Sequence, residues 1–334
     1  NSETIMPVIL PPDLPATQIL QKEGRTVLRS EEMDAQRPKP LRIGLLNLMP
    51  DKIATETQFA RLLGGNPYPV KLSLFRIRDH TSKTCSATHL QRHYRIFDLS
   101  AAQSLDGLII TGAPVEHLDY GRVSYWPSLI EAMDLAAAHV PETLAVCWGA
   151  MALAFHHHGL KKHLRTSKAF GCVRHMVDDP ASPLVFGIQD GCRVPVSRWT
   201  TLSQIEIDRH GALSTLMTGA VGGPSVIRDD AHRATYVLNH FEYDHDTLAK
   251  EYARDLANDV PIKLPQGYFP NDDPTARPLN VWESTGRILY ANWLNMIFEG
   301  AGQRAIKTTL ARSPRRPATS QSQRRIQSML ELSF

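Results

Sequence analysis

The sequence predicts an α/β fold with a doubly wound, mostly parallel sheet, and three observations support this prediction. Short apolar runs alternate with segments of helical periodicity between residues 41 and 155. The apolar runs contain few polar positions, as expected of strands that are covered on both faces. The order strand, helix, strand, helix, strand is typical of parallel sheets with right-handed crossovers.

The first predicted strand follows an N-terminal segment of different composition. Residues 1–40 are rich in proline at first and then polar, so we expect an extended arm with one short helix. Residues 41–48 form a nearly continuous apolar run of strand length. The helix after this strand carries Ile53, Phe59 and Leu62 on its apolar side and should end at Gly64 and Gly65.

The same alternation continues along the chain. We expect strands at residues 70–75, 105–110 and 143–147, and helices at residues 127–139 and 151–155. Residues 161–233 show a less regular pattern with short strands, for example at residues 225–227. Asp246 is expected to cap a helix with Leu248, Tyr252 and Leu256 on one side, and residues 288–298 form a last apolar segment.

Composition and charge limit the possible functions. The chain has 334 residues, of which 42% are hydrophobic and 21% charged, enough to bury a large core. The longest apolar stretch, residues 144–155, is too short to cross a bilayer, and residues 1–6 contain no secretory signal. We therefore expect a cytoplasmic protein. Four cysteines lack CxxC or zinc spacing, so no disulfide framework is predicted.

The domain organisation follows from the same patterns. Residues 1–40 are predicted to form the N-terminal arm, residues 41–302 a single α/β domain, and residues 303–334 a disordered tail. The tail has seven basic residues and one acid, whereas the chain as a whole has a net charge of +3. The rest of the chain is therefore mildly acidic.

Cys147 is the first candidate for catalysis because it stands where a predicted strand passes into a helix. At this position the helix dipole and the free backbone N–H groups favour the thiolate, the nucleophilic form of cysteine. The alternative is a structural role, since free cysteine is often a small buried hydrophobe.

A base and an orienting acid occur in comparable positions downstream. The apolar run at residues 235–243 contains His240, followed two residues later by Glu242. An imidazole can take the proton of a thiol, and a carboxylate can hold the imidazole in the required tautomer. Each residue alone is compatible with an ordinary polar group at a strand end. Together they form a Cys/His/Glu set at the carboxyl ends of predicted strands, where open α/β sheets bind ligands.

Five motifs in order along the chain resemble the homoserine O-acyltransferases of methionine biosynthesis. They are Leu46-Asn-Leu-Met-Pro-Asp-Lys52, Ile109-Ile-Thr-Gly-Ala-Pro114, Cys147-Trp-Gly-Ala150, His240-Phe-Glu-Tyr243 and Asn292-Trp-Leu-Asn295. The resemblance implies a flavodoxin-like sheet of the class I glutamine-amidotransferase type with C-terminal helical additions. It also implies ping-pong transfer of an acyl group from acyl-CoA, through a thioester on Cys147, to the γ-hydroxyl of L-homoserine. We expect no permanently bound cofactor, and a homodimer.

The resemblance also assigns roles to individual residues. His240 is the implied proton acceptor, and Glu242 is its partner. Lys168, Ser197 and Arg254 fall at substrate-binding positions, where the arginine can hold the homoserine carboxylate through two parallel hydrogen bonds. Without the resemblance, these three residues would be assigned as surface charges and a turn hydroxyl. Backbone N–H groups of Gly112, Ala113 and Trp148 are the expected oxyanion-hole donors.

Glu116 bears on the choice of acyl donor. A glutamate at this position of the family accompanies acetyl transfer, and a small residue accompanies succinyl transfer. A succinyl group ends in a carboxylate, and two like charges about 4 Å apart repel by roughly 4 kcal/mol at an effective dielectric constant near 20. Acetyl-CoA is therefore the expected co-substrate. Val196, Trp199 and Phe241 depart from the family pattern around the acceptor pocket and leave the identity of the acceptor open.

Other functions were weighed against this one. Residues 156–158 are three consecutive histidines, but consecutive helix residues point about 100° apart, so we expect an exposed helix end and no metal. A homoserine O-succinyltransferase, and a glutamine amidotransferase or hydrolase, are alternative enzymes for the same Cys/His/Glu set. Nucleic-acid or partner binding through the basic tail is the non-enzymatic alternative. The tail has no interleaved aromatic residues, so we expect no nucleic-acid partner. The shortness of the longest apolar stretch likewise predicts no membrane association.

Overall fold

The computed structural model describes residues 6–29, 32, 38–79 and 84–312. It divides into two compact units, Asn1–Ile297 and Phe298–Phe334. The described strands all belong to the first unit, and the described part of the second continues helix α9, which spans Glu283–Arg312. The predicted tail from residue 303 is therefore helical as far as Arg312. The rest of it lies outside the described residues.

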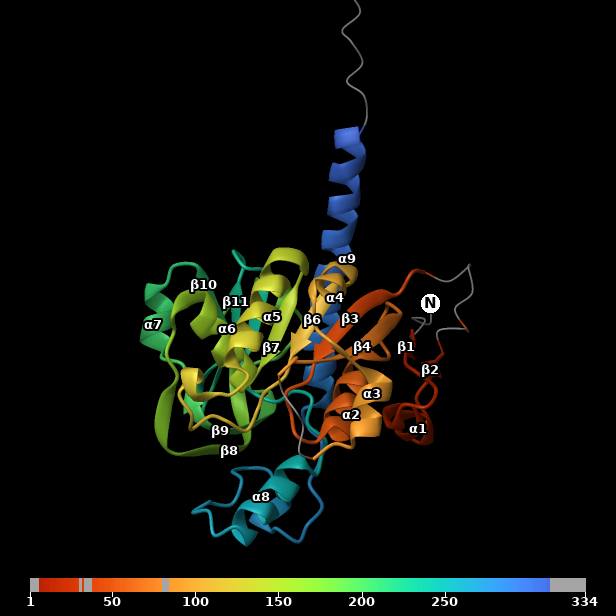
Figure 1. Ribbon diagram of the computed structural model, residues 1–334. Helices are drawn as coiled ribbons and strands as arrows, with labels where there is room; N and C mark the ends of the chain where they lie inside the picture. Colours follow the sequence, from red (N-terminus) through yellow and green to blue (C-terminus); the bar gives the residue numbers. More distant parts are fainter. Residues whose placement is uncertain (1–5, 30–31, 33–37, 80–83, 313–334) are drawn as a thin grey trace, which may run out of the picture. The chain divides into compact units, whose positions relative to one another are not determined.

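The first unit is built on one mixed, twelve-stranded sheet with the order β2-β1-β4-β3-β6-β7-β12-β11-β10-β8-β9, and β5 pairs with β4 (Figure 1). The predicted doubly wound, mostly parallel α/β fold is confirmed for its central part. The central parallel strands are β3 (Leu41–Leu46), β4 (Val70–Arg76), β6 (Gly107–Ile110), β7 (Thr143–Val146) and β12 (Ala234–Val237). The helices of this part are α2 (Lys52–Leu63), α3 (Ala87–His93), α4 (Leu99–Ser104), α5 (Trp126–His139) and α6 (Trp148–His158).

Both faces of the parallel strands are buried, which explains their continuous apolar pattern. Leu108 and Ile110 of β6 join Met151 of α6 in one hydrophobic core, together with residues of α4 and α5. Ile109 lies on the opposite face, in a second core with Trp293 of α9 and residues of α1 and α2. Side chains alternate between the two faces of a strand, so neither face is left for solvent.

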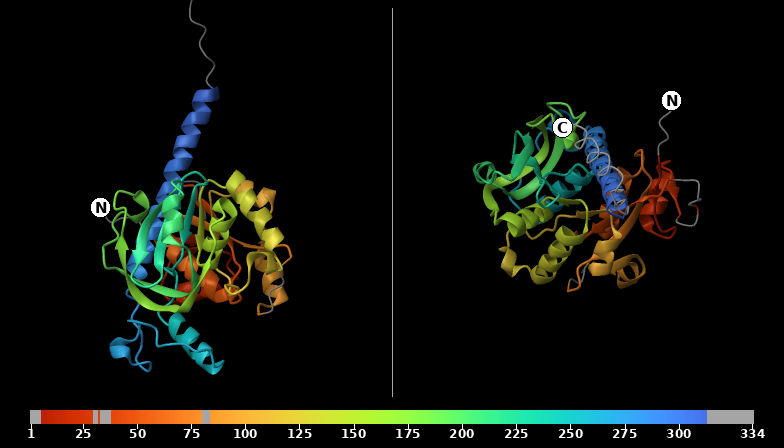
Figure 2. Two further views of the ribbon diagram at one scale, coloured as in Figure 1. Left: turned by 90° about the vertical axis from the view of Figure 1, so that its left-hand side faces the viewer. Right: turned by 90° about the horizontal axis from the view of Figure 1, so that it is seen from above.

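Residues 161–233 form antiparallel strands that are longer than the short strands expected there, and the strand expected at residues 225–227 is present (Figure 2, left). The long strand β8 pairs with β9 and β10, and β11 joins this group to β12. Antiparallel strands commonly bury one face only, which mixes polar with apolar residues in the sequence. The elements are β8 (His163–Val177), β9 (Arg193–Thr201), α7 (Gln204–Arg209), β10 (Leu213–Gly219) and β11 (Gly223–Asp229).

The N-terminal segment contains the one short helix that we expected, but the residues on either side of it belong to the sheet and do not form an extended arm. β1 (Val8–Ile9) pairs in parallel with β4, and β2 (Val27–Leu28) pairs with β1. Between them lies α1 (Pro15–Lys22), with the proline in its first turn, where a missing N–H costs least. Because prolines stand between these short elements, the sequence pattern did not reveal the two strands.

The remaining elements complete the first unit. Helix α2 begins after Asp51, whose side chain accepts a hydrogen bond from Ala54 N, and it ends at Gly64 as predicted. Helix α8 (Thr247–Ala257) begins after Asp246, but this carboxylate pairs with Lys250 Nζ at 2.8 Å and caps no helix N–H. Other short elements are β5 (Tyr94–Ile96) and the 3-10 turns Tyr120–Arg122, Pro183–Val185 and Pro270–Asp272.

The predicted apolar side of α8 is only partly present. Leu248 is buried, Tyr252 is half-buried, and Leu256 is 49% exposed. A third hydrophobic cluster, which includes Leu248, Tyr268 and Trp282, lies beneath this helix. Helix α8 lies beyond the carboxyl ends of the central strands (Figure 1). Each helix of the described part is too short or too polar to span a bilayer.

Gly149 marks the closest approach of α6 to the end of β6. A Cβ at this position would lie 2.4 Å from the carbonyl oxygen of Thr111 and 3.1 Å from that of Ile110. Both are backbone atoms, so the overlap with an added methyl group can be removed only if α6 moves. We expect Gly149→Ala to lower the free energy of unfolding by about 2 kcal/mol, although alanine is the better helix former by about 1 kcal/mol. Urea unfolding measures this.

The matched control is Gly121→Ala, because nothing lies within 4 Å of a Cβ built at Gly121. We expect its free energy of unfolding to change by no more than about 0.5 kcal/mol. Equal stability of the two variants would contradict the close approach.

Candidate active site

Cys147 forms the junction between β7 and α6 and has a strained backbone. Its φ is 51° and its ψ −119°, a conformation that costs a residue other than glycine about 1–3 kcal/mol. Two hydrogen bonds hold it there: Cys147 N donates to Val237 O at 2.7 Å, and Met151 N donates to Cys147 O at 3.1 Å. The residue is 5% exposed and occupies the N-cap of α6. The thiol therefore stands at a helix N-terminus, as predicted.

His240 reaches Cys147 because β12 and β7 are parallel neighbours. Val237 pairs with Val146, so the chain after β12 passes beside the end of β7. His240 N donates to Pro195 O at 2.9 Å, which fixes the histidine against β9. Its Nδ1 lies 2.7 Å from Glu242 Oε1, and its ring has a hydrogen-bonding contact with Cys147. The structure thus brings together the three residues of the predicted Cys/His/Glu set.

The charge state of this set follows from competing effects on His240. Burial lowers the pKa of the imidazole, but the negative charges of Glu242 and Cys147 and the hydrogen bonds to both residues raise it well above its ordinary value. His240 is therefore held as an imidazolium, the form that stabilises a neighbouring thiolate. The ring of Tyr243 stacks on it at 4.0 Å between centroids.

A second cation, Arg198, is fully buried close to Cys147. Its guanidinium donates to the carbonyl oxygens of Thr200 at 2.8 Å, Gly222 at 2.9 Å and Pro224 at 3.2 Å. Burial lowers the pKa of Arg198 to about 10, and the charge of Cys147 opposes that shift. Nothing in the sequence around Arg198 distinguishes it from a surface arginine, so no role was predicted for it.

The three predicted substrate-binding residues gather around two acids of α8, Glu251 and Asp255. Lys168 Nζ lies 2.9 Å from Asp255 Oδ2 and 3.4 Å from Glu251 Oε2, and Ser197 donates to the Glu251 carboxylate. Arg254 donates to Asp255 Oδ1 through Nε at 2.8 Å and Nη2 at 2.6 Å. The side chain of Lys168 is 7% exposed, whereas that of Arg254 is 60% exposed. Only the arginine thus faces solvent.

Tyr243 connects this group to the Cys/His/Glu set. Its hydroxyl donates to Glu251 Oε1 at 2.8 Å while its ring stacks on His240. Burial, followed by the charge of Glu251, raises the pKa of Tyr243 well above its ordinary value, so the hydroxyl remains a donor. Glu251 and Asp255 were not among the predicted site residues. Their i, i+4 spacing places both on one face of α8, and this was the available signal.

Glu116 is tied to the backbone of β9. Its Oε2 accepts hydrogen bonds from Trp199 N at 2.7 Å, and from Thr200 N and Oγ1 at 3.1 Å each. The carboxylate is thereby fixed next to the strand that carries Ser197. Of the three residues that depart from the family pattern, Val196 and Phe241 are buried in hydrophobic clusters and Trp199 is half-buried. Phe241 shares its cluster with Cys147, and the role of the three residues in the acceptor pocket stays a prediction.

The expected oxyanion-hole segments lie against each other. A Cβ at Gly112 would be 3.2 Å from Cys147 Cβ and 3.7 Å from Trp148 N. Trp148 is the first residue of α6, and N–H groups in a first helical turn have no acceptor within the helix. The backbone of Gly112 and Ala113 therefore borders the same space as the N-terminus of α6.

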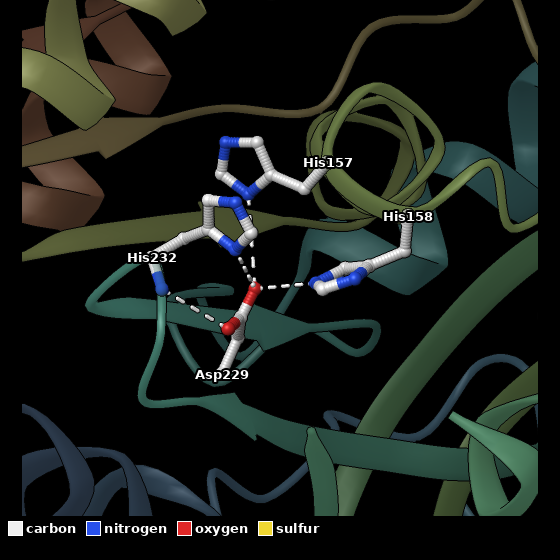
Figure 3. A group of neighbouring side chains, drawn as sticks. All are labelled: His157, His158, Asp229 and His232. Atoms are coloured by element: carbon white, nitrogen blue, oxygen red, sulfur yellow. Dashed lines mark hydrogen bonds and ion pairs between the residues drawn. The ribbon is translucent and has the colours of Figure 1, made fainter. Parts of the chain in front are cut away.

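The expectation of an exposed helix end at residues 156–158 is wrong. The side chains of His157 and His158 are 6% and 7% exposed, and both approach Oδ2 of Asp229, at 3.8 Å and 2.5 Å (Figure 3). His157 uses its near nitrogen Nδ1, and His158 uses its far nitrogen Nε2. This difference in reach lets two side chains that leave the helix in different directions meet at one oxygen.

Asn239, which precedes His240, is held by a buried network. Its Nδ2 donates to His175 Nε2 at 2.7 Å and to Ser225 Oγ at 2.8 Å, and its Oδ1 accepts from Arg198 Nε at 3.2 Å. His175 Nδ1 in turn donates to Val173 O at 2.9 Å. This arrangement requires a neutral His175, and burial lowers its pKa to about 4.

We expect His175 to make the protein less stable as the pH falls. Histidine in the unfolded chain binds a proton near pH 6.5, whereas folded His175 binds one near pH 4. Between these values the unfolded state holds more protons. The stabilisation is therefore complete above about pH 6.5 and is lost as the pH falls to about 4. Between pH 7 and pH 4.5 the loss amounts to about 2 kcal/mol.

Urea unfolding of the wild type and His175→Gln at these two pH values isolates this contribution, because the other titrating groups are common to both. A glutamine oxygen can still accept from Asn239, so the variant should lose about 2 kcal/mol less than the wild type. His139→Gln, a change of an exposed histidine, should behave as the wild type does. An unchanged pH dependence in His175→Gln would show that His175 is not buried in its neutral form.

Comparisons with known proteins bear on the identity of this site. A protein family described as Homoserine O-succinyltransferase matches residues 7–302. A homoserine O-acetyltransferase from Cereibacter sphaeroides is 49% identical over 294 residues, which cover 88% of this chain and 96% of that protein. A homoserine O-acetyltransferase from Jannaschia sp. is 50% identical over 295 residues, which cover 88% of this chain and 94% of that protein.

Solved structures with a similar fold are far more distant in sequence. A glutamine amidotransferase from Thermotoga maritima is 11% identical, with a TM-score of 0.52, and the match covers 78% of this chain and 99% of that one. A glutamine amidotransferase from Methylobacillus flagellatus is 15% identical, with a TM-score of 0.50, and covers 78% and 95%. These similarities concern the fold alone.

Proposed function

The chain belongs to the homoserine O-succinyltransferase family and is a homoserine O-acyltransferase of methionine biosynthesis, and on that premise we propose that it transfers acetyl from acetyl-CoA to L-homoserine through a Cys147 thioester. The observation that carries the proposal is the contact of His240 with Cys147 on one side and Glu242 on the other, at the N-terminus of α6. This is the arrangement of an activated cysteine nucleophile.

The first half-reaction acylates the enzyme. The Cys147 thiolate attacks the acetyl carbonyl, and the negative oxygen that forms is stabilised by backbone N–H groups of Gly112, Ala113 and Trp148. The carbon–sulfur bond to CoA then breaks. His240 gives its proton to the departing CoA thiolate, which leaves an acetyl thioester on Cys147 and a neutral imidazole. Glu242 keeps Nδ1 protonated, so the proton moves at the nitrogen that faces the sulfur.

The second half-reaction reverses these roles. Neutral His240 takes the proton from the γ-hydroxyl of homoserine, whose oxygen attacks the thioester carbonyl. The tetrahedral intermediate collapses to O-acetylhomoserine and returns the thiolate and the imidazolium. A buried, hydrogen-bonded imidazole serves as acid in one half and base in the other.

The acceptor is held by the residues around Glu251. Arg254 binds the homoserine α-carboxylate with its exposed guanidinium, and the carboxylate of Glu251 accepts from the α-ammonium group. Lys168 and Ser197 contact Glu251, so they fix the position of the Glu251 carboxylate. The Tyr243 hydroxyl donates to Glu251 while its ring stacks on His240, and this holds the Glu251 carboxylate near the imidazole.

The remaining parts of the proposal concern the setting of the reaction. Acetyl-CoA is a co-substrate, and no permanently bound cofactor takes part in the steps above. The enzyme acts as a homodimer in the cytoplasm, and its four free cysteines fit a reducing compartment.

Intact-mass analysis after mixing with acetyl-CoA in the absence of an acceptor tests the thioester. We expect one added acetyl group on the wild type, none on Cys147→Ala, and loss of the adduct when homoserine is added. Cys172→Ala is the matched control, because Cys172 is a buried free thiol with its pKa raised by burial to about 12, and it should still acquire the acetyl group. An acetylated Cys147→Ala, or ammonia release from glutamine as the faster reaction, would refute the proposal.

Glu116→Gln tests the choice of donor without disturbing β9. The glutamine oxygen can still accept from Trp199 N and Thr200 N, but the negative charge is gone. We expect the ratio of kcat/KM for acetyl-CoA to that for succinyl-CoA to fall at least about tenfold, which corresponds to roughly 1.4 kcal/mol of the repulsion. If the wild type uses succinyl-CoA faster than acetyl-CoA, the donor is misassigned, although the chemistry of Cys147 stands.

A further inference from the structure

Three histidines surround one carboxylate oxygen at the end of α6 away from Cys147. His157 and His158 belong to the last turn of α6, Asp229 ends β11, and His232 lies between β11 and β12 (Figure 3). Oδ2 of Asp229 is 2.5 Å from His158 Nε2, 2.8 Å from His232 Nδ1 and 3.8 Å from His157 Nδ1. These four ligand atoms all lie within 4.8 Å of one another.

One oxygen atom faces more donors than it can serve. Besides His158 and His232, the hydroxyl of Tyr236 donates to Asp229 Oδ2 at 2.8 Å, and His157 Nδ1 lies 3.0 Å from that hydroxyl. A carboxylate oxygen offers two lone pairs, so these three donor groups on Oδ2 exceed its capacity. Convergence of several imidazole nitrogens on one oxygen is the arrangement expected where a cation belongs between them.

The side chain of Asp229 is also a fully buried charge. His158 Nε2, His232 Nδ1 and the Tyr236 hydroxyl lie within hydrogen-bonding distance of this carboxylate. A buried carboxylate needs a compensating positive charge. The adjacent Arg228 does not supply it, because its guanidinium is engaged by Glu142 at 2.7 Å and by Asp230 at 2.8 Å.

We propose that His157 Nδ1, His158 Nε2, His232 Nδ1 and Asp229 Oδ2 bind one divalent transition-metal ion, with zinc the preferred metal. Imidazole and carboxylate ligands suit zinc, which adopts tetrahedral coordination with bonds of about 2 Å. Such bonds place neighbouring ligand atoms roughly 3.3 Å apart. The present separations require only small side-chain movements to reach this value. Each imidazole then binds through a neutral nitrogen and carries its proton on the other one.

The location indicates a structural role for the ion. Four protein ligands fill a tetrahedral shell and leave no position for substrate. The site joins the carboxyl end of α6 to the turn that precedes β12. These are the elements that carry Cys147 at the start of α6 and lead to His240 after β12. A bound ion therefore fixes one end of both elements while the candidate catalytic residues occupy the other.

Calorimetric titration with Zn²⁺ tests the site, using the full chain with Cys147→Ala so that this thiol and His240 cannot act as ligands together. We expect one ion per chain. Adding His158→Gln or His232→Gln should weaken binding at least about tenfold, since each removes one ligand. His156→Gln is the matched control: His156 lies on the same helix but pairs with Asp134 at 2.7 Å, so binding should be unchanged.

Thermal unfolding and Co²⁺ spectra supply independent readouts. Zn²⁺ should raise the melting temperature of the His156→Gln protein and not that of His232→Gln, whose side chain is 34% exposed and therefore a mild substitution. Co²⁺ should give visible bands of tetrahedral intensity without sulfur-to-metal charge transfer. Absence of stoichiometric binding in Cys147→Ala, or undiminished binding in both His158→Gln and His232→Gln, would overturn the proposal and leave a cluster of protonated histidines around Asp229.

Discussion

The parallel pairing of β7 with β12 is the constraint on which the rest of the site depends. Cys147 follows one strand and His240 follows the other, and the register places Val146 beside Val237. The hydrogen bond from Cys147 N to Val237 O continues this pairing past the end of β7. Between the two strands the chain forms the antiparallel strands β8–β11 and returns to the centre of the sheet. A thiol and an imidazole distant in sequence meet because of this return.

Burial would normally neutralise the ionisable groups around this pairing, but here charges of opposite sign alternate. Glu242 and Cys147 both interact with the His240 imidazolium, and Lys168 faces Glu251 and Asp255. Burial lowers the pKa of His240, but the neighbouring negative charges raise it by more, so the pKa lies well above its ordinary value. A site with its dipoles and charges already in place does not have to reorganise during the reaction. Removing one member leaves another charge buried without compensation, so we expect the site to act as a unit.

The sequence could predict the elements buried on both faces, because a continuous apolar run has few other interpretations. The parallel strands β3, β4, β6 and β7 and the position of Cys147 are of this kind. It could not predict the antiparallel region or the short strand β1, since mixed polarity and prolines also occur in loops. Glu251 was missed because an acid on an amphipathic helix usually faces solvent. The convergence of His157 and His158 depends on which ring nitrogen each uses, and residue spacing does not encode this.

The strained backbone of Cys147 is maintained by contacts at both ends of α6. A residue other than glycine keeps a positive φ only when its surroundings over-determine it. At the start of α6, the backbone of Cys147 is hydrogen-bonded to β12, and Gly149 lies against the carbonyl oxygen of Thr111. At the other end, His158 Nε2 and His157 Nδ1 lie 2.5 Å and 3.8 Å from Oδ2 of Asp229 in β11. A helix fixed at both ends cannot rotate to relax its first residue. Because a reactive group displaced by about 0.5 Å already loses productive geometry, the contacts at the far end of α6 bear on the position of the sulfur as well as on stability.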